Sequence, residues 1–214
     1  MAMSTLVLHG PQVSTYGRIC AVVAQECGVA WRVDATSAAD VRARGLHPFG
    51  RTPAAVIDGE TFIETRAICA YLDAAHGQRR FTPDDPVSLA RMHQWISVAD
   101  NYLFAVSEPG LVLPRLVAPL MGRQADERLV ARALPAIDWQ LGLFCDRLEV
   151  VPFLAGAEIS LADFHVFPMM QAIALTPEGG AMVRAKLPLQ RWLSTLAGRP
   201  SAKATRWPIE GGVG

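Results

Sequence analysis

Short apolar runs alternate with segments of helical periodicity along the early part of the chain. A short apolar run bounded by turn residues is typical of a buried strand, whereas apolar positions three and four residues apart are typical of a helix. Ile19, Val22 and Val23 follow the helical spacing, and Asp58-Gly59 between two apolar runs indicates a tight hairpin. The patterns predict strands at residues 5–9, 30–33, 54–57 and 61–63, and helices at residues 14–27, in the stretch that ends at residue 46, and at 65–75.

The element order β-α-β-α-β-β-α predicts a four-stranded mixed sheet covered by helices. A right-handed β-α-β crossover makes the first two strands parallel, and the tight turn makes the last two antiparallel. Residues 1–77 therefore form one predicted α/β domain, and the polar, proline-containing segment 78–86 is the predicted linker.

After this linker only helical spacing remains. Apolar residues share a helical face over residues 92–106 and again over 130–148, and further helices are predicted at 160–173 and 189–196. Pro135 lies inside the second of these helices, where we expect a kink or a helix boundary. Residues 87–207 are predicted as an all-helical domain and residues 208–214 as a flexible tail.

Composition narrows the classes of function and location. The chain has 20 basic and 20 acidic side chains, so it lacks the basic footprint of a nucleic-acid binder. The apolar run near the amino terminus is too short for a signal peptide, and no stretch approaches the ~18 apolar residues of a membrane span, so we expect a cytoplasmic protein. Cys20, Cys27, Cys69 and Cys145 form no CxxC pair, which favours buried apolar side chains over a metal site or disulfides.

Ser14 is the first candidate for chemistry because it follows a strand and a Gly-Pro turn and precedes a helix. A serine there can simply cap the helix. The same position also lets its hydroxyl, supported by the helix dipole, donate a hydrogen bond to a bound thiolate, and thiols in such settings have lowered pKa values.

Two further segments carry polar groups at the ends of strands. Thr52-Pro53 precedes a predicted strand and is either an ordinary loop or, with a cis bond, a place where a peptide-like ligand pairs with the backbone of Thr52. At Glu64-Thr65 a strand becomes a helix, and Thr65 is a plausible N-cap. A carboxylate beside exposed helix amides also suits the head group of an α-amino acid.

Several segments together resemble the glutathione transferases over nearly the whole chain. The run LHGPQVSTYGR is similar to the first strand and catalytic turn of the serine-type phi class and its bacterial relatives. HPFGRTPAAVIDG followed by FIETRAICAYL resembles the family's N-P-F-G and E-S-R-A-I segments, and LPLQRWLSTLAGRPSAKA resembles its closing helix. FLAGAEISLADF resembles the family's helix-capping motif, in which Ser160 and Asp163 have capping-box spacing and serve folding.

The resemblance implies a thioredoxin-like N-terminal domain that binds glutathione and an all-α domain that helps to bind the second substrate. It implies that Ser14 stabilises the glutathione thiolate, with Thr15 a lesser candidate. Thr52, before cis-Pro53, would pair with the cysteinyl backbone of glutathione, and Glu64 and Thr65 would hold its γ-glutamyl end.

The glycine end of glutathione lacks its usual partner, because the His-Lys pair of phi relatives is missing here. Arg42, Arg44 or Arg51 could replace it, since a guanidinium suits a carboxylate. His47 stands where the family has asparagine. Of the three arginines, Arg51 is taken as the candidate for the site.

The resemblance implies glutathione conjugation to small hydrophobic electrophiles, without a metal, in a homodimeric detoxification enzyme. Tyr16, Tyr102, Phe104 and Leu111 are candidates for the acceptor pocket, although the last three equally fit a helix-bundle core. Two alternatives remain. One is a glutathione-dependent thiol oxidoreductase or peroxidase that works through Cys20, and the other is a non-catalytic binding module of the same fold.

Overall fold

The computed structural model describes residues 4–211, which divide into two compact units. The first unit comprises the chain up to Thr82 together with the residues from Gly198 onward, and the second comprises Pro83–Ala197. The division after Thr82 lies inside the segment 78–86. Residues from Gly198 return to the first unit, whereas the sequence pattern places residues up to 207 in the helical domain.

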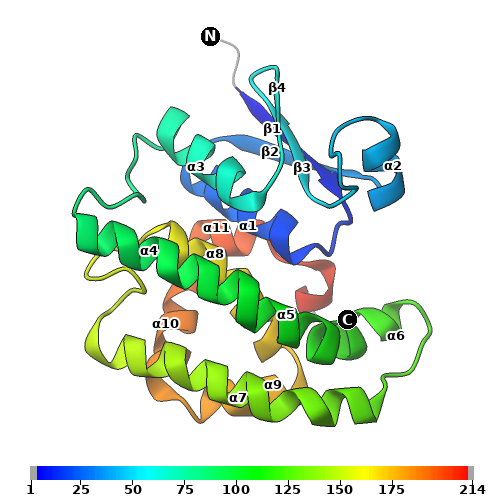
Figure 1. Ribbon diagram of the computed structural model, residues 1–214, viewed down its shortest axis with the longest axis vertical. Coiled ribbons are helices and arrows are strands. Elements are labelled where there is room, and N and C mark those ends of the chain that lie inside the picture. Colours follow the sequence, from blue (N-terminus) through cyan, green and yellow to red (C-terminus); the bar gives the residue numbers. More distant parts are fainter. Residues whose placement is uncertain (1–3, 212–214) are drawn as a thin grey trace. The chain divides into compact units, whose positions relative to one another are not determined.

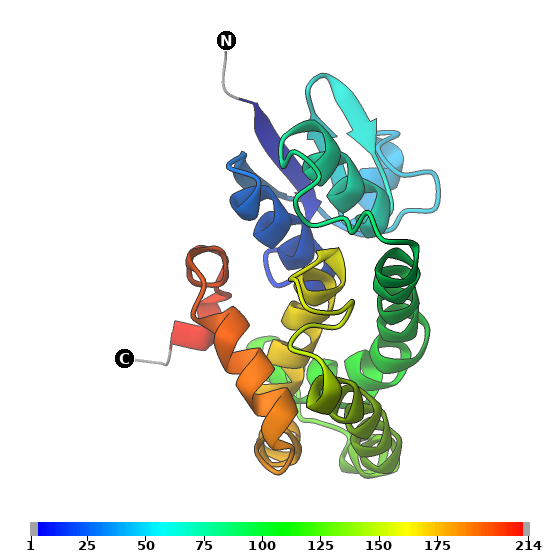
Figure 2. The ribbon, with the colours of Figure 1, turned by 90° about the vertical axis from the view of Figure 1, so that its left-hand side faces the viewer.

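The first unit contains the four-stranded mixed sheet that the sequence predicts (Figure 1). Its strand order is β2-β1-β3-β4; β1 pairs with β2 in parallel, and the β1–β3 and β3–β4 pairs are antiparallel. Asp58 and Gly59 both have positive φ, of 55° and 83°, as a tight hairpin turn requires. Figure 2 shows the resulting β3–β4 hairpin in cyan, with β4 at one edge of the sheet. The strands are β1 Thr5–Gly10, β2 Ala30–Ala35, β3 Ala54–Ile57 and β4 Glu60–Phe62.

Three helices of this unit follow the predicted order. They are α1 Thr15–Glu26, α2 Ala38–Ala43 and α3 Thr65–Ala75. The helices α1 and α3 contact each other, and α1 also contacts β1 and β2. Leu6, Leu8, Ile19, Ile57 and Ile68 are almost fully buried and form part of the core that fixes α1 against the sheet.

The end of the chain returns to α1. Helix α11, Pro200–Ala204, contacts α1 and lies beside it in Figure 1, and Pro208–Gly211 forms the short 3₁₀ helix η3. Glu210 pairs with the buried Arg18 of α1, so the prediction of a flexible tail is wrong for residues 208–211. Residues 212–214 lie outside the described part. Sequence periodicity did not reveal this return because its anchor joins residues 192 positions apart.

A second anchor joins Arg199 to the carboxyl-terminal end of α1. The guanidinium donates to both carboxylate oxygens of Glu26, at 2.6 and 2.7 Å, and the hydroxyl of Ser201 donates to the same carboxylate. Burial raises the pKa of Glu26, but the hydrogen bonds from Arg199 and Ser201 outweigh it and the net pKa is lowered. The ionised form of Glu26 is therefore the form that the folded chain favours.

Replacing Glu26 by glutamine is expected to lower the free energy of unfolding by about 1–3 kcal/mol at neutral pH, because hydrogen bonds to a charged group are lost. The folded-state pKa lies below the ordinary value of 4.5, so the stabilisation is present above that pH and is lost as pH falls through the folded-state pKa. Urea unfolding of both proteins from neutral to acid pH measures the difference. Glu149→Gln, at an exposed position of the second unit, is the control. If the difference in free energy of unfolding between wild type and Glu26→Gln is the same at low pH as at neutral pH, the ionised carboxylate of Glu26 is not the source of the stabilisation.

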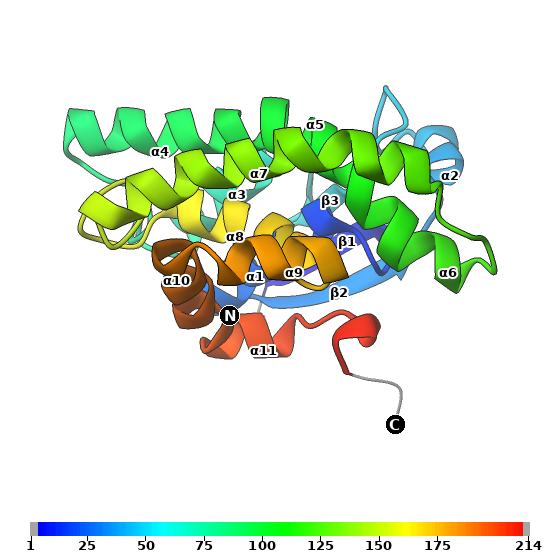
Figure 3. The same cartoon turned by 90° about the horizontal axis from the view of Figure 1, so that it is seen from below.

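The second unit is helical throughout its regular structure. Helix α7 contacts α5, α9 and α10, and Figure 3 shows α4 and α9 on opposite sides of it. Helix α7 runs through Pro135 without ending, so no helix boundary lies there. The elements are α4 Pro86–Val98, η1 Ala99–Leu103, α5 Phe104–Ser107, η2 Glu108–Val117, α6 Ala118–Leu120, α7 Glu127–Val150, α8 Leu161–Ala174, α9 Pro177–Arg184 and α10 Leu187–Ala197, where η1 and η2 are π-helical.

The helical run Pro86–Leu120 is long and apolar enough to cross a membrane by length and composition. Its best 18-residue window has a mean hydropathy of 1.3, and 33% of that window is buried. The expectation that no stretch approaches a spanning length is therefore wrong for this run. Length and composition alone do not separate a spanning helix from a helix of a globular unit, so one such run is weak evidence for a membrane protein.

Helix α8 begins with the capping box that the sequence predicts. The Ser160 hydroxyl accepts from the amide of Ala162, and the fully buried Asp163 carboxylate accepts from the Ser160 amide at 2.9 Å. Asp163 also accepts from the amide of Leu154 and from the indole of Trp192. This one carboxylate therefore joins the loop before α8 to α10.

Candidate functional site

Ser14 stands at the amino end of α1 and caps it. Its hydroxyl oxygen accepts from the amide of Gly17 at 3.0 Å, and its φ and ψ of −83° and 122° are the extended values of an N-cap residue. A Cβ at Gly17 would lie 3.1 Å from the Ser14 Cβ and 3.3 Å from its hydroxyl oxygen. The glycine therefore leaves room for the hydroxyl.

The Thr52-Pro53 peptide lies against the end of β1. The bond is cis, as the family resemblance implies. A Cβ at Gly10 would lie 3.1 Å from the Cβ of Thr52, so a glycine at the end of β1 permits this close approach. Ser14 and Pro53 border one cavity, described below.

Glu64 has a left-handed backbone, with φ of 66°, where β4 leads into α3. Non-glycine residues in this region are uncommon, and such strain often marks functional sites. Its side chain is 68% exposed, and the imidazole Nε2 of the buried His47 lies 3.9 Å from its carboxylate. Glu64, and not Thr65, is the N-cap residue of α3, and no side chain caps this end. Thr65 is the first helical residue, because the helix starts one position earlier than a threonine cap would require. Its side chain is buried.

The basic residues near this end of the sheet differ in their partners. Arg44 lies 3.3 Å from the carboxylate of Asp34, which also lies 3.1 Å from His9 Nδ1. Arg51 and Arg42 are exposed. Of the three arginines that could hold a carboxylate, Arg44 therefore already has an acidic neighbour.

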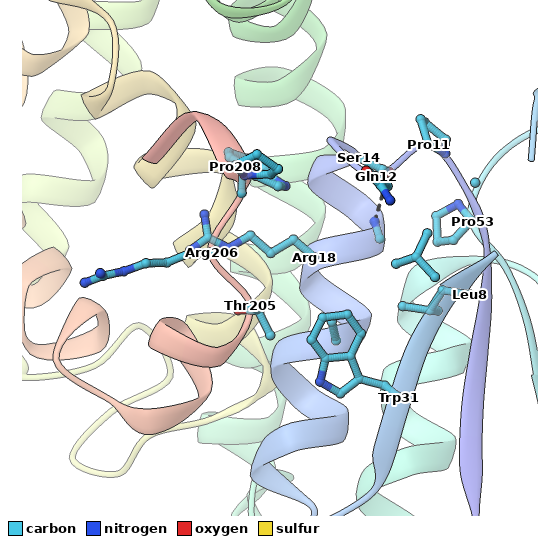
Figure 4. Close-up of a pocket in the computed structure, with 15 residues that line it drawn as sticks. Leu8, Pro11, Gln12, Ser14, Arg18, Trp31, Pro53, Thr205, Arg206 and Pro208 are labelled. Carbon is cyan, nitrogen blue, oxygen red and sulfur yellow. Dashed lines mark hydrogen bonds between the residues drawn. The ribbon is translucent and has the colours of Figure 1, made fainter. Parts of the chain in front are cut away.

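A cavity of about 320 Å³ opens beside Ser14 within the first unit (Figure 4). Its walls come from β1 and the turn after it, from α1, from β2, from Pro53, and from the returning carboxyl-terminal segment. The lining residues are Leu8, Gly10, Pro11, Gln12, Ser14, Gly17, Arg18, Ala21, Trp31, Val33, Pro53, Thr205, Arg206, Trp207 and Pro208.

The sequence-predicted acceptor residues do not line this cavity. Tyr16 is half-buried on α1; in the second unit Tyr102 is 63% exposed, Phe104 is half-buried and Leu111 is fully buried. Thr15 is buried as the first residue of α1. The assignment of the four residues to an acceptor pocket stays a prediction.

Comparison with known proteins identifies the family. A model of the glutathione S-transferase N-terminal domain matches residues 8–80, and one of the C-terminal domain matches residues 110–200. Glutathione S-transferase F11 of Arabidopsis thaliana is 30% identical over 159 residues, which are 73% of each chain. The chain belongs to the glutathione S-transferase family. The F-type name of this relative agrees with the resemblance to the phi class.

Solved structures of glutathione S-transferases share the fold. Glutathione S-transferase III in its apo form has a TM-score of 0.85 and 26% identity, over 95% of this chain and 97% of that one. Glutathione S-transferase-I bound with lactoylglutathione has a TM-score of 0.84 and 25% identity, over 94% and 97%. The chain is therefore an enzyme of this family, with an α/β N-terminal part and a helical C-terminal part.

The four cysteines of this transferase are buried and unbridged. Cys20 has no exposed surface, so it cannot contact a substrate in this conformation. Burial is the largest cause that raises the pKa of Cys27, to about 12, and nearby Asp73 adds to it, so its thiol stays protonated. Neither thiol supports the cysteine-based oxidoreductase alternative.

Sequence reasoning missed the residues that complete the cavity. Arg18 lies on the buried face of α1, and its only sequence signal is a charge beside the apolar Ile19. Trp31 and Val33 are two positions apart on β2, so strand periodicity alone could have placed their side chains on the same face of the sheet. Trp207 carried no signal, because its place depends on the returning end of the chain.

Proposed function

We propose that this glutathione transferase conjugates the thiol of glutathione to small hydrophobic electrophiles, with the thiolate stabilised by the Ser14 hydroxyl. The position of Ser14 at the amino end of α1, on the border of a cavity, carries the proposal. The solved relative bound with lactoylglutathione supports glutathione as the ligand of this site.

The cap and the proposed bond to the thiolate can exist together. A hydroxyl has two acceptor lone pairs and one hydrogen, and the cap uses only a lone pair. The hydrogen can therefore point to a sulfur held at the amino end of α1, where the positive end of the helix dipole also attracts the thiolate. Both interactions favour the thiolate over the thiol and so lower the pKa of bound glutathione.

The reaction then needs no covalent bond to the protein. The thiol proton leaves to solvent, and the thiolate sulfur forms a bond to the electrophilic carbon. In a displacement the leaving group departs with its bonding electron pair. Ser14 acts as a fixed hydrogen-bond donor, which is electrostatic stabilisation.

We propose that glutathione lies along the end of the sheet from Ser14 to Glu64. The backbone of Thr52 pairs with its cysteinyl part, with Pro53 and Thr15 beside it. The Glu64 carboxylate pairs with the α-ammonium, and the uncapped start of α3 at Thr65 receives the α-carboxylate. Arg51 is the proposed partner of the glycine carboxylate. The family also supports a cytoplasmic homodimer and a role in detoxification.

Replacing Glu64 by glutamine is expected to raise the Kd for glutathione about tenfold to a hundredfold, because a hydrogen bond between charged groups contributes about 1.5–3 kcal/mol. Isothermal titration with glutathione measures the change. Glu60→Gln, an exposed carboxylate on β4, is the control. If the Kd for glutathione is the same for Glu64→Gln as for the control, Glu64 does not hold the ammonium group.

A further inference from the structure

The buried His47 lies next to Glu64, the proposed partner of the α-ammonium group of glutathione. The side chain of His47 is 2% exposed, whereas that of Glu64 is 68% exposed, and the imidazole Nε2 lies 3.9 Å from the Glu64 carboxylate. The family has asparagine in the place of His47. An imidazole reaches further than the amide of an asparagine, and Nε2, the ring nitrogen that lies beyond such an amide, is the one near the carboxylate.

One hydrogen bond determines the tautomer of this ring. The amide of Phe49 donates to the imidazole Nδ1 at 3.2 Å. A backbone amide is always a donor, so Nδ1 is the acceptor and the ring hydrogen lies on Nε2. The amide of Gly50 closes the same turn by donating to the carbonyl oxygen of His47 at 3.0 Å. The turn therefore holds the ring with its N–H donor on the side of Glu64.

Glu64 combines a defined backbone conformation with an exposed side chain. Its left-handed φ of 66° sets the direction in which the side chain leaves the backbone. The separation of 3.9 Å from Nε2 is longer than the ~2.7–3.2 Å of an N–H···O hydrogen bond, so the carboxylate lies near the donor without being bonded to it. Rotation about the side-chain bonds of an exposed glutamate can close this distance.

We propose that His47 is a positioning residue, whose Nε2–H donates to one oxygen of the Glu64 carboxylate while the other oxygen binds the α-ammonium of glutathione. The inference rests on the proposed function. A carboxylate has acceptor lone pairs on both oxygens, so it can serve both partners. An exposed glutamate loses rotamer freedom when it binds a ligand, and a second hydrogen bond to it offsets that cost. His47 acts through Glu64, because its own ring is buried.

The two ring nitrogens separate this role from a purely structural one. Nδ1 serves the turn, and Nε2 serves Glu64. Asparagine places an amide oxygen near the position of Nδ1 and has no atom at that of Nε2, whereas glutamine places an amide nitrogen near the position of Nε2 and has no acceptor at that of Nδ1. His47→Asn therefore keeps the bond from Phe49 and removes the donor to Glu64, and His47→Gln does the reverse.

Isothermal titration with glutathione measures the effect of the two variants. We expect His47→Asn to raise the Kd for glutathione about threefold to tenfold, as the loss of one hydrogen bond does, and His47→Gln to stay within about twofold of wild type. His76→Asn, which removes an imidazole 2.8 Å from a carboxylate at the other end of α3, is the control. Equal affinity in wild type and His47→Asn, or equal weakening in both His47 variants, overturns the proposal.

A double-mutant cycle shows whether His47 acts through Glu64. In the Glu64→Gln background, His47→Asn should change the Kd for glutathione less than about twofold, because the carboxylate that it positions is absent. Glutaryl-cysteinylglycine, which is glutathione without its α-ammonium group, should bind equally to wild type and to His47→Asn. If His47→Asn weakens either of these complexes as much as it weakens the complex of otherwise wild-type protein with glutathione, the proposal is overturned.

Nitrogen-15 NMR of the protein without glutathione separates this inference from the proposed function, with the His47 signals assigned by their absence in His47→Asn. A ring hydrogen on Nε2, and an Nε2 signal that moves in Glu64→Gln, support the contact even if glutathione binds elsewhere and the proposed function fails. A hydrogen on Nδ1, or an Nε2 signal that does not move, overturns it. A Kd for glutathione raised by Glu64→Gln but not by His47→Asn supports the proposed function and overturns the positioning role.

Discussion

Replacing Ser14 by alanine is expected to lower kcat/KM for conjugation about tenfold to fiftyfold near pH 6.5. A hydrogen bond to a charged group contributes about 1.5–3 kcal/mol, and its loss raises the pKa of the bound thiol by one to two units. Near pH 6.5 the fraction of thiolate falls by about tenfold to fiftyfold, because the bound thiol of the variant, with a pKa near the ordinary ~8.5, is almost wholly protonated at this pH. Steady-state rates at saturating glutathione measure the effect, and the difference narrows at high pH, where the thiol ionises in both proteins.

The loss of the helix cap must be separated from the loss of the donor. Replacing an N-cap serine by alanine lowers the stability by about 0.5–2 kcal/mol, whereas replacing it by glycine lowers the stability by only about a few tenths of a kcal/mol. Ser14→Gly lacks the hydroxyl but keeps an acceptable cap, so it should lose activity as Ser14→Ala does. Asp85→Ala removes the cap of α4 and should leave the rate unchanged. Full activity in Ser14→Gly contradicts the role of the hydroxyl.

Replacing Asp163 by alanine is expected to lower the free energy of unfolding by at least about 3 kcal/mol. The change strands three buried N–H donors, of Leu154, Ser160 and Trp192, and each unsatisfied donor costs about 1–3 kcal/mol. Burial raises the pKa of Asp163, while these donors act against that rise. The midpoint of urea unfolding measures the loss.

Ser160→Ala is the matched control for Asp163→Ala. It removes the hydroxyl of the same capping box, which also donates to the carboxylate at 3.0 Å, but leaves the three N–H donors in place, so only about 0.5–2 kcal/mol should be lost. If Asp163→Ala costs no more than Ser160→Ala, the carboxylate does not join the loop before α8 to α10. A glutathione Kd unchanged in the folded fraction of both variants would show that their role is structural.

Local signals predicted the first unit well. The order of strands and helices, the hairpin at Asp58-Gly59 and the limits of α3 were predicted correctly, because each depends on residues close together in the sequence. The capping box of α8 belongs to the same group. Such patterns describe the periodicity and the ends of elements, which neighbouring residues determine.

Features that depend on distant residues were not predicted. The place of Trp207 and Glu210 follows from the burial of Arg18, which no pattern near the end of the chain reveals. The helical run through η2 was missed because Pro109, Gly110 and Pro114 interrupt the apolar spacing. Gly110 lies so close to α7 that an added Cβ would approach the Ala133 Cβ to 2.4 Å, so packing accounts for the glycine.

The candidate site also has a part that local patterns predicted and a part that depends on distant residues. Ser14, Thr52, Pro53 and Glu64 stand at the ends of strands, where turn chemistry and the family resemblance both indicate them. The cavity could not be predicted, because its walls combine β2, α1 and the returning carboxyl-terminal segment. Only the folded arrangement brings Trp31 and Trp207 to the same cavity.

The ultraviolet absorbance of the bound glutathione thiolate, titrated against pH in the wild type and in Ser14→Ala, tests the central claim most directly. The proposed mechanism predicts that the thiolate of the wild-type complex forms at least one pH unit below the ~8.5 of a free thiol, and that Ser14→Ala loses most of this shift. A thiolate that titrates at the same lowered pH in both proteins, or no thiolate at saturating glutathione, would contradict it.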